Sequence, residues 1–553
     1  MKLRYDKKRQ KLILTEATRT EYHQVKIGLT KKVKGYQFTP TYKMNIWDGN
    51  ISHFDDGEFD LGLWKEVYSM CKQHGWKFEL ENKEDFPINR KITYEQVDEF
   101  CKDFFKDHTL PDGKEFTPYE HQIDSAFKIM KNRYCLTEVA TGGGKSLIFA
   151  IIAFYILREV NPKAKFLLIV PNISLVTQFY DDITDYNHGF KNGGQNKNAL
   201  DINMCEIMSD KPRRDEGEAN IVIGTVQSLE KRLAKKEFKG WFEQFNIVAT
   251  DESHKAGNGA KASGIKQIKK VIKRTVGTAY MRFGMSGTYP EEGSLDWLTV
   301  QSLHGPKIAE VQAKKLMEQG IISTVKIKSL LLNHNNPNFN NQLTMIKGGG
   351  NAKACYDLEK NYIHESEPRL NFITDKILSK IKKNSLVLFN IKDYGKKIFK
   401  KIRDEVPNVD VYYIDGDTKK DKREFIKAKM DNIGRRGKIG KILGDDTIKD
   451  RPKVLVASFG TLSTGVSIKN LHNVVFMESF KSEQVIIQSI GRILRLHKDK
   501  DRATVFDIVD IFDGETRKKN ILYKHYEVRK AFYEKREYPM EELKIILKNK
   551  FDL

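Results

Sequence analysis

The middle and the end of the chain share one pattern, in which short apolar runs alternate with amphipathic, helix-like segments. The runs at 166–170 and 247–250 are continuously apolar, as expected for strands that are covered on both faces. Glycine, serine or threonine follows each run, and a helix-like segment follows that. This rhythm predicts an α/β fold built on parallel sheets with helices on both faces.

The pattern occurs twice in succession, which predicts two tandem α/β domains. In the first, which covers 111–322, we expect strands at 133–136, 166–170, 221–223, 247–250 and 282–285 and a closing helix at 314–320. In the second, which covers 323–515, we expect strands at 385–389, 411–414, 454–457, 474–476 and 503–507. The turn-rich stretch 334–350 and the basic loop within 430–452 read as insertions.

Residues 1–110 have a different character and predict a small α+β domain. Short β-like pieces lie at 11–15, 23–27, 36–40 and 45–49, and a helix-like segment follows at 63–74. Lysine and arginine interleave here with the aromatic residues Tyr22, Tyr36, Phe38, Tyr42 and Trp47. Such aromatics line a nucleic-acid surface or form the core of a small sheet, and both interpretations stay open. Residues 516–553 predict a helical C-terminal extension.

Composition narrows the class of protein. The chain has 553 residues, 39% of them hydrophobic, which suffices for folded cores and excludes a disordered protein. Its 96 Lys and Arg exceed its 74 Asp and Glu, giving a net charge of +22. That excess favours a polyanionic partner, nucleic acid first, over a plain solvated basic surface.

Cysteine usage and hydropathy indicate the compartment. The five cysteines are scattered without a C-x-x-C pair, which argues against a disulfide scaffold and a structural zinc site and suits a reducing compartment. The N-terminus lacks a signal-peptide pattern, and the apolar run 147–157 is too short to span a bilayer. We therefore expect a cytoplasmic protein with no membrane partner.

A glycine-rich stretch at 139–146, Val-Ala-Thr-Gly-Gly-Gly-Lys-Ser, lies between an expected strand and an expected helix. Backbone N–H groups of such a turn converge on phosphate, at the positive end of the helix dipole. We expect ATP to be held by Thr141, Gly142, Gly143, Gly144, Lys145 and Ser146. Lys145 would reach the β- and γ-phosphates, and the Ser146 hydroxyl would ligate Mg²⁺. Val139 departs from the glycine that the full P-loop pattern requires.

An acidic pair follows the expected strand at 247–250. The carboxyl end of a parallel strand faces the ligand edge of its sheet, so Asp251 can hold Mg²⁺ there. Glu252 would then orient and deprotonate the attacking water. Alone, Asp-Glu-Ser-His could be an ordinary acidic turn, but a P-loop on a neighbouring strand favours the catalytic interpretation.

Two further stretches add chemistry. Ser286 and Thr288, in Gly-Met-Ser-Gly-Thr, could hydrogen-bond the acidic motif, together with His254, and relay the state of the nucleotide. Arg492 and Arg495 are three residues apart and are expected on one helix face, where they could act as arginine fingers on the γ-phosphate. A solvated basic helix is the alternative.

In this order the motifs resemble those of superfamily 2 helicases of the DExH type. The matching stretches are 118–122, 139–146, 170–178, 224–228, 251–254, 286–288, 458–465 and 488–495. With Tyr36-Gln-Phe-Thr-Pro40 and Trp47-Asp-Gly49, the layout is similar to the UvsW-type recombination helicases of T-even-like phages. The resemblance implies two RecA-like domains with ATP between them and a nucleic-acid-binding N-terminal domain.

The resemblance also assigns residues and partners. It implies that Gln122 reads adenine, that Gly465 and Gln488 approach the nucleotide, and that Arg492 and Arg495 act across the cleft. The nucleic-acid contacts it implies are Ser174, Thr225, Gln227 and Thr461. It implies unwinding and branch migration of forks, Holliday junctions, D-loops and RNA–DNA hybrids in recombination, repair and replication. We expect a monomer in a phage-infected host's cytoplasm, working with single-strand-binding or recombination proteins.

A second class of function stays open on the sequence alone. A double-stranded-DNA translocase subunit of a restriction complex would track along DNA without separating strands. It would use the same ATP-binding motifs, so only a strand-separation measurement distinguishes the two.

Overall fold

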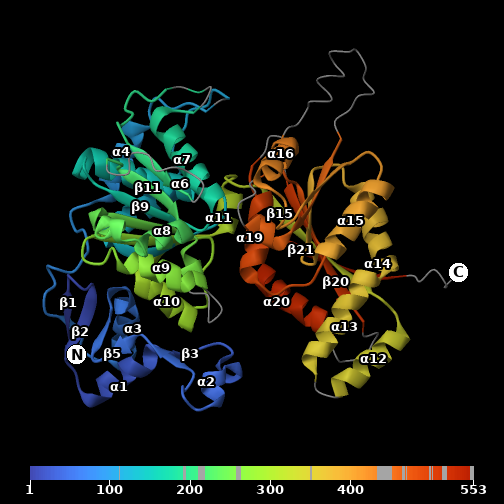
Figure 1. The fold of residues 1–553 in the computed structure, drawn as a ribbon. Helices are drawn as coiled ribbons and strands as arrows, with labels where there is room; N and C mark the ends of the chain where they lie inside the picture. Colours follow the sequence, from blue (N-terminus) through green and yellow to red (C-terminus); the bar gives the residue numbers. More distant parts are fainter. Residues whose placement is uncertain are drawn as a thin grey trace. The chain divides into compact units, whose positions relative to one another are not determined.

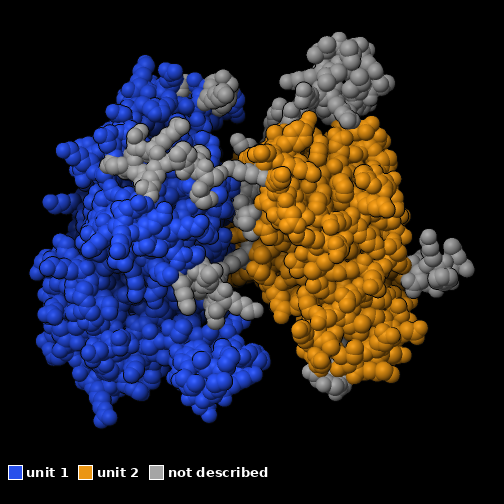
Figure 2. Space-filling model, in the orientation of Figure 1, with its two compact units in different colours: residues 1–312 blue, residues 313–553 orange. Residues whose placement is uncertain are grey.

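The computed structural model describes residues 1–110, 112–190, 193, 195–208, 218–256, 263–348, 351–431, 451–463, 468, 470–496, 500, 502–512 and 520–547. The chain divides into two compact units, residues 1–312 and 313–553 (Figure 2). Each unit contains one seven-stranded sheet (Figure 1). These sheets confirm the predicted tandem α/β architecture.

The sheet of the first unit has the order β10-β11-β9-β12-β13-β8-β14, and all its pairings are parallel. Its strands are β8 (Tyr134–Val139), β9 (Phe166–Val170), β10 (Met204–Ile207), β11 (Ile221–Thr225), β12 (Ile247–Asp251), β13 (Met281–Ser286) and β14 (Lys307–Val311). All residues of β8, β9, β11, β12 and β13 are buried, as their continuous apolar runs predict. The sequence pattern did not reveal β10 and β14.

Helices cover this sheet, and those that follow one of its strands start beyond that strand's carboxyl end. They are α4 (Tyr94–Phe104), α5 (Glu120–Asn132), α6 (Lys145–Tyr155), α7 (Ile173–His188), α8 (Val226–Leu233), α9 (Ser263–Lys273) and α10 (Leu295–His304). Every described residue of α6 from Leu147 to Tyr155 is buried, so this helix forms the centre of the domain. Parallel strands joined by helices place all their carboxyl ends along one edge.

The N-terminal region forms the sheet β5-β6-β2-β1-β7 and the hairpin β3-β4. Its elements are β1 (Lys2–Asp6), β2 (Lys11–Glu16), α1 (Arg19–Gly28), β3 (Thr30–Lys32), α2 (Pro40–Lys43), β4 (Asn50–Ser52), β5 (Phe54–Asp55), β6 (Glu58–Asp60), α3 (Trp64–His74) and β7 (Glu79–Leu80). Three strand predictions were wrong. The stretch 23–27 lies in α1, because Thr18 and Glu21 form a capping box that starts a helix. The stretch 36–40 forms a 3₁₀ turn and the start of α2, and 45–49 contains no strand.

The interleaved aromatic residues do not form the core of this region. That core contains Leu3, Tyr5, Leu12, Phe54 and Phe59. The side chains of Tyr22, Tyr36, Phe38, Tyr42 and Trp47 are all half-buried or exposed, and Phe38 is 76% exposed. Tyr22 packs edge-on against Phe54 of the core and Tyr36 packs against Tyr42, so Phe38 is the ring of this set that the structure leaves most exposed.

The N-terminal region packs on the amino-terminal edge of the first sheet. Gln10, in the β1–β2 turn, donates from Nε2 to the Tyr134 hydroxyl (2.8 Å) and to the Ala279 carbonyl (2.9 Å). Its Oε1 accepts from the buried guanidinium of Arg282 (2.8 Å). One apolar cluster extends from Leu3 to Leu303, so this region shares a core with the sheet domain.

The sheet of the second unit has the order β17-β18-β16-β19-β20-β15-β21, again with parallel pairings throughout. Its strands are β15 (Thr324–Asn333), β16 (Ser385–Phe389), β17 (Asp410–Ile414), β18 (Lys453–Ser458), β19 (Asn473–Phe476), β20 (Arg502–Ile511) and β21 (Met540–Ile546). Its helices are α11 (Ala313–Glu318), α12 (Pro337–Gly348), α13 (Ala352–Glu365), α14 (Glu367–Phe372), α15 (Lys392–Glu405), α16 (Lys420–Asp431), α18 (Phe459–Ser463), α19 (Glu483–Ile493) and α20 (Ile521–Lys535).

Three details of the second unit differ from the sequence pattern. The stretch 337–348, expected to be an irregular insertion, forms α12, whose Phe339 and Leu343 pack on Phe512. The C-terminal segment contains α20 as expected, but β21 follows it and pairs with β15. The basic loop at 434–441 lies outside the described residues. Within the described part of the chain, no helix is long and apolar enough to cross a membrane.

Candidate ATP and nucleic-acid site

The sequence motifs of the first unit form an ordered row along the carboxyl edge of its sheet. The strand order β11-β9-β12-β13-β8 places the expected nucleic-acid residues after β11 and β9, and the acidic pair after β12. The P-loop follows β8, and Ser286 ends β13, which lies between β12 and β8. We expected the acidic strand β12 to pair directly with the P-loop strand β8, but β13 lies between them. The serine-threonine motif separates them and can contact both.

The P-loop backbone turns sharply at two glycines. Gly142 and Gly144 have φ of 89° and 84°, in the left-handed region that glycine adopts without strain. A Cβ at Gly144 would lie 2.2 Å from Nε2 of Gln122, so only glycine fits there. Val139, the departure from the full pattern, is fully buried at the end of β8 and pairs with Val311. Its side chain belongs to the core and does not obstruct the loop.

Helix α5 holds the P-loop from the side. The Gly143 carbonyl accepts hydrogen bonds from Nε2 of His121 (2.9 Å) and from Nε2 of Gln122 (3.2 Å). Oε1 of Gln122 accepts from the Tyr119 backbone N–H (2.9 Å), which fixes the amide orientation. Gln122 is thus placed beside the loop, and His121 is a loop contact that the sequence did not reveal.

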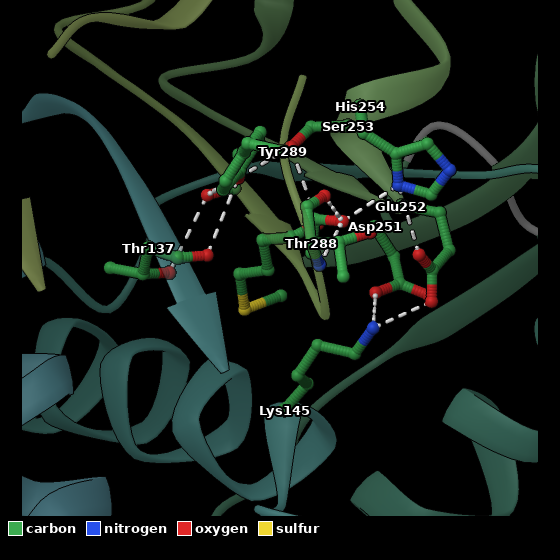
Figure 3. Close-up of polar contacts among 11 residues, drawn as sticks. Thr137, Lys145, Asp251, Glu252, Ser253, His254, Thr288 and Tyr289 are labelled. Carbon is green, nitrogen blue, oxygen red and sulfur yellow. Dashed lines mark hydrogen bonds and ion pairs between the residues drawn. The ribbon is translucent and has the colours of Figure 1, made fainter. Parts of the chain in front are cut away.

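The centre of the site is a group of three charges, of which Asp251 is buried and Lys145 and Glu252 are half-buried (Figure 3). The Lys145 ammonium lies 2.7 Å from Oε1 of Glu252 and 3.1 Å from Oδ1 of Asp251. Burial would lower the pKa of Lys145, but the two carboxylates outweigh burial and raise it. Burial raises the pKa of Asp251, whereas Lys145 and His254 overcome burial at Glu252 and lower its pKa. One cation therefore serves two acids, and Glu252 carries the negative charge that a base needs.

Glu252 is held in a strained backbone conformation. Its φ is 50°, which costs a residue with a Cβ roughly 1–2 kcal/mol. The conformation brings Oε2 within 3.2 Å of Nδ1 of His254. Left-handed backbone at a residue other than glycine is consistent with a functional constraint.

A hydrogen-bond chain joins the acidic motif to β13. Nδ1 of His254 lies 2.7 Å from Oγ of Ser286, and that hydroxyl donates its hydrogen to the Thr288 carbonyl (2.6 Å). The hydroxyl must therefore accept from His254, so Nδ1 carries the proton and also faces Glu252. Ser286 therefore contacts the acidic motif through His254, as the sequence predicts, whereas Thr288 is joined to that motif only through Ser286.

Tyr289 adds a second connection that the sequence did not indicate (Figure 3). Its hydroxyl lies 2.8 Å from Oγ of Ser253, 3.2 Å from the Gly284 carbonyl and 3.3 Å from the Thr137 carbonyl. The phenol therefore ties the P-loop strand β8, the intervening strand β13 and the acidic motif together. The sequence does not indicate where the side chain of an aromatic residue after Ser-Gly-Thr points, so only the fold reveals these contacts of Tyr289.

The donor set suits Mg²⁺. Oδ1 of Asp251 is buried and lies 3.1 Å from the Lys145 ammonium, so a hard oxygen ligand is present beside the P-loop lysine. The Ser146 hydroxyl contacts the Tyr186 phenol, whose pKa burial raises to about 12. Among the described residues no cluster of three or more metal-ligating side chains occurs. This is consistent with Mg²⁺, which takes one or two protein ligands and completes its shell with phosphate and water.

The expected nucleic-acid residues lie at helix starts. Thr225 caps α8 by accepting from the Ser228 N–H and is buried, and Gln227 in the first turn is exposed. Ser174 begins α7, where its hydroxyl donates to Asn172 (2.7 Å). In the second unit, Thr461 is buried, and its hydroxyl lies 2.6 Å from that of Ser458.

The arginines of the second unit do not share one helix face. Arg492 lies in the last turn of α19, but the helix ends at Ile493 and Arg495 follows its cap. The ending has a physical cause, because Nζ of Lys500 donates to the Ile493 carbonyl (2.7 Å) and the Ser323 N–H donates to the Leu494 carbonyl (2.8 Å). Gln488 is half-buried within α19, and Gly465 lies outside the described residues.

The sequence of this chain matches known protein families. The family model for the type III restriction enzyme res subunit matches residues 113–291, and the model for the helicase conserved C-terminal domain matches residues 369–497. The ATP-dependent DNA helicase uvsW of Enterobacteria phage T4 is 30% identical over 498 residues, which cover 88% of this chain and 87% of the relative. The chain is a superfamily 2 helicase of the UvsW family.

Solved structures outside the UvsW family share the fold alone. The ATP-dependent Type ISP restriction-modification enzyme LlaBIII bound to DNA has a TM-score of 0.54 at 14% identity, over 87% of this chain and 36% of that chain. The DEAD-box helicase Mss116 bound to ssRNA and UDP-BeF has a TM-score of 0.51 at 13% identity, over 81% and 83% of the two chains. As a member of the UvsW family, this chain is an ATP-dependent DNA helicase.

Proposed function

We propose that this helicase unwinds and branch-migrates forks, Holliday junctions and D-loops, and separates RNA–DNA hybrids, in a phage-infected host's cytoplasm. The observation that carries the proposal is the group Lys145, Asp251 and Glu252, in which one ammonium pairs with two acids at the carboxyl edge of the sheet. A site that buries unbalanced charge is suited to a ligand that brings the missing cation and phosphates. The family relationship over most of the chain supports the branched substrates.

The residues have distinct roles in the proposed hydrolysis of ATP. Lys145 would leave the carboxylates and bind the β- and γ-phosphates, while the N–H groups of residues 141–146 hold the phosphate chain. Glu252, freed from Lys145, would take a proton from the attacking water. Ser146 and Asp251 would hold Mg²⁺, which supplies a Lewis acid on the phosphate oxygens. Gln122 would read adenine, and Gly465 and Gln488 would approach the nucleotide.

The other residues would couple hydrolysis to movement. Arg492 and Arg495 are proposed to stabilise the charge that develops on the γ-phosphate. Ser174, Thr225, Gln227 and Thr461 are proposed to contact the strand, with the two buried threonines positioning their loops. The exposed ring of Phe38 and the lysines around it support an N-terminal domain, 1–110, that binds nucleic acid.

The replacement Lys145→Ala tests the proposed ATP site. We expect DNA-stimulated ATP hydrolysis to fall by about three orders of magnitude, because the phosphates lose their buried countercharge. The matched control is Lys163→Ala, which removes an exposed lysine of the same unit. Undiminished turnover in Lys145→Ala would refute the assignment of this site.

A duplex translocase that does not separate strands is the second candidate. The match of residues 113–291 to the type III restriction enzyme res subunit favours considering it. Displacement of a labelled strand from a fork and displacement of a triplex-forming strand from a duplex distinguish the two. We expect both activities, whereas triplex displacement without fork unwinding would establish the translocase.

A further inference from the structure

Helices α8 and α9 lie side by side in the first unit (Figure 1). Residues near the C-terminal ends of both helices line a groove. The groove has a volume of about 780 Å³, and its walls include Lys231, Lys273 and Arg274. A second hollow of about 350 Å³ adjoins it, shares Arg274, and adds Lys236 and Lys239. Because α8 and α9 start near the motif edge and run back, these hollows lie toward the opposite edge of the sheet.

The positive charge in this groove is largely uncompensated. Glu230 pairs with Lys270 at 2.9 Å, which uses the one acid that lines the first hollow. Among the described residues, no ion pair is recorded for Lys231, Lys273 or Arg274, and all three are exposed. The same holds for Lys236 and Lys239 in the adjoining hollow, whose lining includes one acid, Glu243.

The basic surface continues onto the N-terminal domain. Gly277, just after α9, packs against the β1–β2 turn, where its Cβ position would lie 3.1 Å from the Lys8 carbonyl. The side chains of Lys7 and Lys8 are exposed in that turn. Attraction of lysine to a helix C-terminus explains a basic last turn of α8 or α9. It does not explain Lys236 and Lys239, which lie beyond α8.

We propose that this groove, together with Lys7 and Lys8, is a second DNA-binding surface that holds the phosphate backbone of a duplex arm away from the motor motifs. The inference rests on the proposed action on branched DNA, because a junction has arms that the motor does not enclose. Binding is through phosphates rather than stacked bases, since no large apolar side chain of α8, of the described part of α9 or of residues 234–245 is among the exposed ones. Phe238 and Phe242 lie buried beneath Arg232 and Trp241.

The test compares two triple variants that lose the same charge. The groove variant is Lys231→Gln, Lys273→Gln and Arg274→Gln. The control is Lys380→Gln, Lys382→Gln and Lys400→Gln, exposed lysines of the second unit with no recorded ion pair among described residues. Binding of fluorescent blunt duplex and of single-stranded DNA is measured without ATP over a range of salt concentrations. Because all six side chains are exposed, we expect both variants to keep the wild-type unfolding temperature.

We expect the groove variant to bind duplex about tenfold or more weakly and its log K against log salt slope to fall by about 2 to 3, since each lost phosphate contact removes about 0.9. Single-strand affinity and maximal single-strand-stimulated ATP hydrolysis should match the control. Equal duplex binding by the two variants, or equal loss on single strands, would overturn the proposal and leave the groove to another acidic partner. Absence of DNA-stimulated hydrolysis in the wild type would instead refute the proposed function, which this binding assay does not measure.

Discussion

The two seven-stranded sheets of this helicase differ in how the acids beside them are balanced by cations. In the first unit, one ammonium, that of Lys145, lies within 3.1 Å of both Asp251 and Glu252, and the His254 ring also faces Glu252. In the second unit, Asp507 and Asp510 lie three residues apart on β20 and so face opposite sides of the sheet. Each of these acids meets its own fully buried arginine, Arg529 from α20 and Arg369 from α14.

The arginine pairs of the second unit are balanced and fully bonded. Asp507 accepts from Nε and Nη2 of Arg529, both at 2.9 Å, and from the Tyr533 hydroxyl at 3.0 Å. Arg369 donates to Asp510, to the Tyr394 hydroxyl and to the Met477 carbonyl. Such bidentate arginine–carboxylate pairs join a helix to a strand and leave neither side chain free to bind a ligand.

This difference in charge balance distinguishes a functional group of charges from a structural ion pair without use of the sequence motifs. A balanced, saturated pair stabilises a core only as long as both partners are present. A group with more acids than cations, one of them on a strained backbone, can still bind a ligand that brings positive charge. The account therefore predicts that charge changes in the first unit alter turnover, whereas those in the second unit alter stability.

The largest effect is expected from Glu252→Gln. Turnover should fall about 10²–10⁴-fold, because the base for the attacking water is lost. The free energy of unfolding should stay the same or rise, since Lys145 and Asp251 then form a one-to-one pair. Steady-state ATP hydrolysis and thermal unfolding measured on one preparation test both statements. A variant that unfolds early and hydrolyses normally when folded would reverse the comparison.

Arg529→Met should have the converse effect. It leaves Asp507 buried beside Tyr533 alone, at a cost of about 3–5 kcal/mol in the free energy of unfolding. Denaturant unfolding measures this loss, and the double variant with Asp507→Asn should recover part of it. Nucleotide affinity at low temperature should be unchanged. Wild-type stability in Arg529→Met would show that the pair is not structural.

Ser286→Ala probes the connection between the acidic motif and β13. It removes the hydroxyl that accepts from His254 and donates to Thr288. We expect ATP hydrolysis to change less than threefold and unwinding to fall by about tenfold, roughly 1.4 kcal/mol of coupling. Parallel losses in both assays would assign Ser286 to hydrolysis itself.

The smallest effect is expected from Tyr289→Phe. The ring stays in place, but Ser253 and two backbone carbonyls lose a shared partner, which costs about 1–2 kcal/mol of stability. Thermal unfolding with and without nucleotide measures the loss, and basal hydrolysis should persist. A Tyr289→Phe protein that is indistinguishable from wild type would remove the phenol from the network.

The sequence predicted those parts of the fold whose signal is local. Strands β9 and β16 are continuous apolar runs and were found with their observed bounds. Strands β15 and β21 were missed because lysine and glutamate interrupt them, and only pairing within the sheet makes them strands. The helix α1 was mistaken for a strand because its few apolar residues alternate, while its capping box was overlooked.

In the candidate site, too, some residues follow from local motifs and others depend on the fold. Lys145, Ser146, Asp251 and Glu252 follow from short motifs, because phosphate and metal chemistry requires those residue types at those spacings. The position of β13 between the two motifs and the contacts of Tyr289 follow from strand order, which adjacent residues do not encode. The helix end before Arg495 likewise depends on Lys500 and Ser323, which come from outside α19.

Calorimetric titration of a non-hydrolysable ATP analogue with Mg²⁺ tests the central claim most directly. The claim is that the unbalanced group of the first unit is the nucleotide site and the balanced pairs of the second unit are structural. We predict that Lys145→Ala loses at least about 100-fold in affinity, equivalent to about 2.7 kcal/mol, while Arg529→Met binds as the wild type does below its unfolding transition. Wild-type affinity in Lys145→Ala, or a comparable loss in folded Arg529→Met, would contradict the account.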